Sequence, residues 1–179
     1  MSTSFNASAY VEIVMNELIT SGNLKSGNIP TVWRVGPTDF ANGTALGQIN
    51  VGYYKKETGI GSAVTTVYDL VGSLTNTEGT VINFDKVKLI AIRNLSSTAA
   101  NYIEIGPDAT AGFGVVASNL GFWKDASDRN IVCADGSCWM ILYNYTGVPA
   151  AAGSTDELAV ITQSTTGNTW ELLVLGIDS

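Results

Sequence analysis

Short apolar segments separated by turn-forming residues recur along most of the chain. From residue 49 onward these segments are spaced about a dozen residues apart, which is typical of an antiparallel sandwich or barrel. Turn clusters such as Thr58-Gly59 and Asp135-Gly136 separate them. We therefore predict an all-β protein, an antiparallel β-sandwich of the jelly-roll-like type. The predicted strands are 49–56, 64–71, 80–84, 86–94, 100–105, 113–117, 129–133, 138–145, 157–163 and 168–177.

The first part of the chain has a less regular pattern. Residues 1–8 are small and polar, which is typical of an arm. In residues 9–20 the alternation of a strand competes with a helical spacing, and the Ser-Gly turn that follows favours the strand. Residues 21–48 are rich in turn formers and read mostly as loop. We predict an extended N-terminal arm and turn-rich lead-in over residues 1–48 and a β-sandwich domain over 49–179.

Three of the predicted strands carry apolar residues on both faces, at 87–93, 138–143 and 170–177. An antiparallel sheet with one wet face alternates apolar and polar residues, so both faces of these strands need cover. Leaving about six such side chains in water would cost on the order of 10 kcal/mol, comparable with the stability of a whole domain. The second layer comes either from the N-terminal 60 residues or from a neighbouring subunit. We predict such contacts at Ile90, Ile92, Trp139, Ile141, Tyr143, Leu173 and Leu175.

Charge narrows the range of partners. Charged residues make up 14% of the chain, against roughly 25% in typical soluble proteins. The net charge of −7 and the lack of a basic patch argue against direct nucleic-acid binding. The chain has no apolar run long enough for a membrane span and no visible signal peptide, so we expect synthesis in a cytoplasm. Residues 1–90 carry a net charge of only −1, which favours that half for contact with another subunit.

Candidate catalytic and metal-binding residues are few. Without histidine the chain has no Ser-His or Cys-His dyad, and two cysteines alone do not make a zinc site. Asp125 and Asp128 are the best local carboxylate pair, for glycosidase chemistry or for calcium, although both also suit a turn. We predict no catalytic residue, no metal, no cofactor and no enzymatic activity.

Two further pairs are candidates for special roles. Cys133 and Cys138 flank Asp135-Gly136, a strong hairpin signal that would place the two thiols opposite each other. They form either a cross-strand disulfide or, as cytoplasmic redox conditions favour, two reduced thiols. Trp33 and Trp123 lie near loops and are candidates for surface aromatic contacts, for example with a sugar.

Three stretches of the sequence resemble small virion proteins of tailed bacteriophages. They are residues 42–50 (NGTALGQIN), 68–94 (YDLVGSLTNTEGTVINFDKVKLIAIRN) and 170–176 (WELLVLG). The resemblance covers roughly residues 42–177 and is most specific over 68–94. It implies a β-sandwich virion component and transfers no catalytic residue.

Within that group the resemblance favours a capsid decoration (cement) protein. Such proteins sit at symmetry axes of the shell, often as trimers, and cover hydrophobic seams. The implied partners are further copies of the chain, with a trimer favoured, and the major capsid protein, and the implied location is the virion. The alternatives are a tail or fibre component and a carbohydrate-binding or receptor-binding β-sandwich module.

Overall fold

A computed structural model describes residues 7–21, 24–75, 79–98, 100–115, 121–134, 139–163 and 167–178. Side chains are described from residue 40 onward within these ranges, except that of Trp139. The described residues form strands joined by turns and loops, with no helix among them. The all-β prediction is confirmed.

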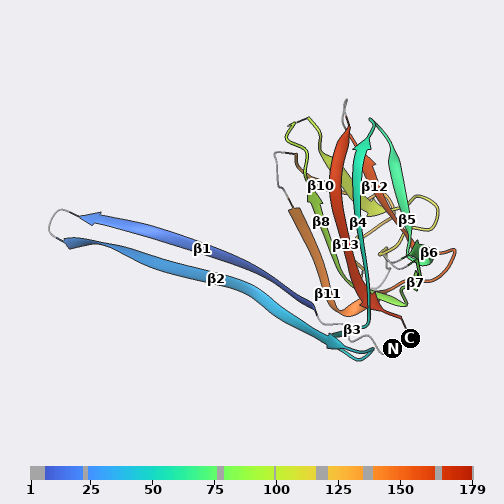
Figure 1. Cartoon of the computed structure of the whole chain (residues 1–179), viewed down its shortest axis with the longest axis horizontal. Helices are drawn as coiled ribbons and strands as arrows, with labels where there is room; N and C mark the ends of the chain where they lie inside the picture. The colour runs from blue at the N-terminus through green and yellow to red at the C-terminus, as the bar shows by residue number, and fades with distance from the viewer. Residues whose placement is uncertain are drawn as a thin grey trace.

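Two four-stranded antiparallel sheets pack face to face (Figure 1). The front sheet has the order β11 (Trp139–Pro149), β8 (Lys86–Asn94), β13 (Asn168–Ile177) and β4 (Val51–Ile60). The back sheet has the order β10 (Asn130–Val132), β9 (Ile103–Pro107), β12 (Glu157–Thr162) and β5 (Thr65–Asp69). A small hairpin of β6 (Val71–Thr75) and β7 (Val81–Asn83) lies between β5 and β8 in the chain.

The connectivity is that of a jelly roll. Taking the eight sandwich strands in chain order, the first pairs with the last (β4 with β13) and the second with the seventh (β5 with β12). The third pairs with the sixth (β8 with β11) and the fourth with the fifth (β9 with β10). This nested pairing is what results when one long antiparallel ribbon is rolled into two sheets, so the jelly-roll prediction is confirmed.

The sandwich core lies between the two sheets. Its largest members, Trp170, Phe84 and Phe113, are completely buried, as are Ile90 and Leu172 from the inner face of the front sheet. Alternation along each strand sends every second side chain into this layer, which is why the short apolar runs of the sequence form strands rather than helices.

The N-terminal segment forms a long antiparallel hairpin of β1 (Ala7–Ser21) and β2 (Leu24–Asn42), which extends away from the two sheets (Figure 1). A short strand, β3 (Gln48–Ile49), pairs in parallel with the end of β2. We predicted mostly loop over residues 21–48, and that prediction was wrong for β2. Pro30 and the glycines of this segment are tolerated in a two-stranded ribbon, because the outer edge of each strand takes no ladder partner over most of its length.

One other local prediction differs from the structure. The predicted strand at 113–117 is represented in its described part by one isolated bridge, from Val115 to Trp123. Asp135 and Gly136, the predicted hairpin turn, lie outside the described residues.

Candidate functional site: the outer face of the front sheet

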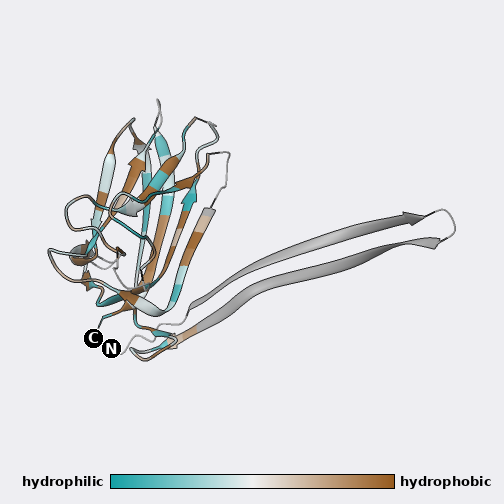
Figure 2. Ribbon diagram, turned by 180° about the vertical axis from the view of Figure 1, so that it is seen from behind, coloured by the Kyte–Doolittle hydropathy of each residue, from teal (hydrophilic) through white to brown (hydrophobic). Residues whose placement is uncertain are grey.

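The outward side of the front sheet, called the outer face below, carries a row of apolar residues. Leu173 on β13 stands opposite Ala91 on β8, and Ala91 stands opposite Ile141 on β11. Residues directly opposite in a ladder share a face, so these three lie side by side. Figure 2 shows hydrophobic and hydrophilic residues alternating along the strands of the sandwich. On the front sheet the alternation is incomplete, because both faces are apolar.

Half of the outer face is covered by the chain's own N-terminal lead-in. Phe40 at the end of β2 and Ile49 in β3 are buried against Leu89 and Leu175. The Phe40 ring also meets the ring of Tyr143 edge-on, with centroids 5.9 Å apart. The lead-in thus supplies part of the second layer that the two-sided strands require.

Polar contacts hold this cover in place. Asn50 bonds the C-terminal end of the chain through its side chain, accepting from the backbone N–H of Asp178 at 2.8 Å. The Nζ of Lys88 donates to the carbonyl of Ala45 at 3.0 Å. Burial, together with the charge of Lys86, lowers the pKa of Lys88. The Lys88 side chain therefore ties the turn after β2 to the front sheet.

The other half of the outer face is an open hollow of about 270 Å³. Its floor is apolar and partly exposed, and its rim is mixed, with Tyr54 donating a hydrogen bond to Glu171 Oε1 at 3.1 Å. An apolar floor with an aromatic and polar rim is the usual composition of a protein interface. The residues lining the hollow are Tyr54, Ala91, Ile92, Arg93, Ile141, Glu171, Leu172 and Leu173.

The predicted contact residues divide between the two faces of the sheet. Ile90 and Ile92 belong to the sandwich core and face the back sheet, so they are not outer-face contacts. Leu175 is on the outer face and is buried beneath Phe40 and Ile49. Alternation shows which residues share a face, but where both faces are apolar it does not show which face turns inward.

The remaining predicted contacts lie on β11 and β13. Ile141 and Leu173 form the floor of the hollow, and Tyr143 is 42% exposed beside the covered half. Trp139 pairs with Arg93 along the ladder, and its side chain lies outside the described residues. The sequence reasoning missed Phe40, which stood in a segment read as loop; a single large apolar residue among turn formers was the available signal.

The predicted aromatic surface contacts are not supported at Trp123. Its side chain is only 6% exposed and packs edge-on against Phe122, with ring centroids 5.8 Å apart. The loop folds inward there, which its position in the sequence did not reveal. The side chain of Trp33 lies outside the described residues.

The predicted cross-strand arrangement of the two cysteines falls partly on residues outside the described ranges. Cys133 is exposed and its thiol is free, and Cys138 lies outside the described residues.

The carboxylates of Asp125 and Asp128 accept hydrogen bonds from backbone N–H groups of a local turn. Asp128 Oδ2 accepts from the backbone N–H groups of Lys124 and Asp125, and Asp125 Oδ1 accepts from the backbone N–H of Ser127 at 2.9 Å. The hydroxyl of Ser127, which also donates to Asp125 Oδ1, and its backbone N–H lower the pKa of Asp125. Within the described ranges no group of three or more acidic or cysteine side chains is arranged to hold a metal ion.

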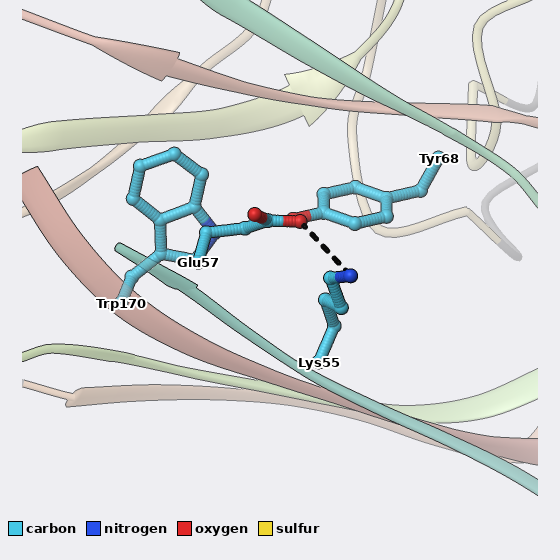
Figure 3. A network of polar contacts seen from close by, with 4 residues as sticks. All are labelled: Lys55, Glu57, Tyr68 and Trp170. Carbon is cyan, nitrogen blue, oxygen red and sulfur yellow. Dashed lines mark hydrogen bonds and ion pairs between the residues drawn. The ribbon is translucent and has the colours of Figure 1, made fainter. Parts of the chain in front are cut away.

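A buried polar contact joins the two sheets. The indole N–H of Trp170 on β13 donates to the hydroxyl of Tyr68 on β5 at 3.2 Å (Figure 3). Burial raises the pKa of Tyr68 far above its usual value, so the phenol stays neutral at physiological pH. Lys55 and Glu57 lie beside this contact, with 3.9 Å between Nζ and Oε1 (Figure 3).

Replacing Tyr68 by phenylalanine is expected to lower the free energy of unfolding by about 1–3 kcal/mol, because the buried indole N–H loses its acceptor. Urea denaturation followed by circular dichroism measures the change. Tyr54→Phe is the matched control and should change stability by less than about 0.5 kcal/mol, since that hydroxyl is exposed. Equal losses in the two variants would contradict the structural role given to the Tyr68 hydroxyl.

The fold and the outer face define the class: a jelly-roll β-sandwich protein with a partly open apolar sheet face. In the part of the chain that the structure describes, no helix is long and apolar enough to cross a membrane. The chain matches no family model and no curated protein.

One similar solved structure is described as "Bacillus endospore appendages form a novel family of disulfide-linked pili". It shares 11% sequence identity with this chain, at a TM-score of 0.34, and the match covers 76% of this chain and 97% of that one. At this TM-score nothing about function follows from the likeness.

Proposed function

We propose that the chain is a structural virion protein of a tailed bacteriophage, by preference a capsid decoration protein that binds and stabilises the head. The role is mechanical rather than catalytic. Its partners are further copies of the chain, with a trimer favoured, and the major capsid protein, with no direct contact to nucleic acid or membrane. The observation that carries the proposal is the outer face, an apolar surface that the chain covers only in part.

The energetics of that face favour repeated contacts over one tight contact. Burying an apolar side chain of this size completely contributes roughly 1.5–3 kcal/mol, and the floor residues Ile141 and Leu173 are already partly buried. A single contact there is therefore weak. Linking several copies raises occupancy on a shell without any tighter individual contact, which suits a trimeric cement protein.

Two other features support the proposal. The double-sheet jelly roll is an architecture that viral capsid domains and lectin domains use. The sequence likeness to virion proteins is strongest over residues 68–94. In the fold this segment runs from β5 in the back sheet, through the β6–β7 hairpin, to β8 in the front sheet.

Co-sedimentation with phage particles that lack the protein tests the function. The wild-type chain is expected to bind the shells and to raise their resistance to heat. Leu173→Lys, which places a charge in the hollow, is expected to bind at least tenfold more weakly. Val67→Lys is the matched control, because Val67 is 44% exposed on the back-sheet strand β5. Binding to tails in place of heads would favour the tail or fibre alternative, and no binding to any particle component would refute a virion role.

A carbohydrate-binding or receptor-binding module is the second candidate. The observation that favours it is the exposed ring of Tyr54, 54% exposed at the rim of the hollow, where an aromatic face could stack on a sugar. Glycan-array binding that disappears in Tyr54→Ala would support this candidate. Absence of glycan binding in the wild-type chain would remove it.

A further inference from the structure

We propose that the β1–β2 hairpin of one copy occupies the open half of the outer face of a neighbouring copy. The inference deepens the proposed function, on which it rests, by naming the occupant of the hollow as a second copy of this chain. It combines two features of the described structure, a long two-stranded ribbon and an apolar sheet face without a full cover.

The hairpin is a two-stranded ribbon over nearly its whole length. Its register runs from Ala7 opposite Phe40 to Ser21 opposite Leu24, and β3 adds a third strand only at Ala41 and Asn42. An isolated two-stranded ribbon is marginally stable at best in water. The hairpin therefore needs a surface to pack on.

The register places several apolar pairs on this ribbon. Ile13 stands opposite Trp33 and Val11 opposite Val35, so these four positions share a face of the ribbon. The other face carries the oppositely charged pair Glu12 and Arg34 and, two residues along, the apolar pair Val14 and Val32. The ribbon thus has apolar positions on both faces, and cover by a partner would stabilise it.

The outer face is already a surface that accepts this segment. Phe40, the last part of the hairpin before β3, is buried on it against Leu89, and the hollow continues the same apolar row along the neighbouring residues Ala91 and Leu173. A strand of 15 residues such as β1 spans roughly 50 Å at about 3.3 Å per residue, longer than any strand of the sandwich. In Figure 1 the hairpin points away from its own sheets, so the surface it can reach is that of another copy.

Charge does not oppose the contact. Two chains of net charge −7 repel each other as wholes, but residues 1–48 carry only two basic and three acidic groups. At the rim of the hollow, Arg93 and Glu171 are of opposite sign. The proposed contact joins two nearly neutral surfaces, where the repulsion is smallest.

Cysteine cross-linking of the full-length chain tests the proposal directly. In a background of Cys133→Ser and Cys138→Ser, a chain with Ile13→Cys is mixed with a chain with Leu173→Cys or Ile141→Cys and oxidised. We expect a dimer-sized product at least tenfold more abundant than with Val67→Cys, the matched control on the other sheet. A chain that carries both Ile13→Cys and Leu173→Cys and gives only an internally linked monomer would show that the hairpin covers its own sheet, which would overturn the proposal.

Native mass gives an independent readout. The wild-type chain is expected to be an oligomer by light scattering, and Ile13→Lys and Leu173→Lys are each expected to shift it to the mass of a monomer, whereas Val67→Lys keeps it. An unchanged mass in both variants, with no cross-link above the control, refutes the exchange of hairpins. Neither measurement involves phage particles, so a failure here is distinguishable from a failure of the shell-binding experiment.

Discussion

Replacing Trp170 by alanine is expected to lower the free energy of unfolding by about 3–5 kcal/mol, the cost of deleting a large aromatic side chain from a core. Trp170 is the largest of the completely buried side chains and lies between the two sheets. The substitution opens a cavity and also removes the hydrogen bond to Tyr68. Because a domain of this kind is stable by only about 5–15 kcal/mol, the loss is a large fraction of the total.

Denaturant unfolding monitored by circular dichroism measures this loss. Trp170→Phe keeps an aromatic ring in the site, so its free energy of unfolding is expected to lie between those of the wild type and the alanine variant. It still allows the effect to be measured if the alanine variant does not fold. Val81→Ala, at a side chain that is 52% exposed, is the control and should lose less than about 1 kcal/mol. A Trp170→Ala loss as small as that of the control would mean that the sandwich core is not packed around this residue.

Gly176→Ala is expected to destabilise the protein by about 3 kcal/mol, at the upper end of what overpacking costs. A Cβ at this position would lie 2.2 Å from the backbone oxygen of Lys86 and 2.7 Å from the ring of Phe84. Neither neighbour can move aside easily, because the Lys86 oxygen belongs to the backbone and Phe84 is completely buried. The carbonyl of Gly176 also accepts from the N–H of Asn50 at 3.1 Å, so a shift of β13 would loosen the segment that precedes β4.

Gly61→Ala is the matched control for this substitution. Its new Cβ would meet nothing closer than Val64 Cγ2 at 3.9 Å, and the residue is exposed. It is expected to leave stability unchanged or to raise it by up to about 1 kcal/mol, because alanine restricts the unfolded chain. Thermal and urea unfolding of both variants give the comparison, and a Gly176→Ala protein as stable as Gly61→Ala would show that β13 and β8 are not as close as described.

The jelly roll was predictable because its cause is local. Short apolar runs, turn residues at regular intervals and few charges leave little choice but two packed antiparallel sheets. The two-sided apolar character of β8, β11 and β13 was equally visible, and it correctly indicated a second layer over part of the front sheet, which Phe40 and Ile49 provide.

The long hairpin was harder to predict from local signals. Pro30 and the neighbouring glycines favour turns in isolation, and only pairing with β1 across the whole register makes the segment a strand. Trp123 shows the same limit, since its bridge to Val115 and its packing in the sandwich core, and not its neighbours in the sequence, bring it inside.

The amino-acid sequence by itself determined the class of fold, the strands of the sandwich and the fact that apolar residues emerge on both sides of the front sheet, because alternation with a period of two is a property of the chain alone. Only the tertiary structure decided that Ile90 and Ile92 face the core, that Leu89 and Leu175 are covered by the chain's own lead-in, and that Ile141 and Leu173 remain in an open hollow. Burial on one side or the other depends on which distant segment arrives to cover it, and that is settled by the packing of the whole molecule.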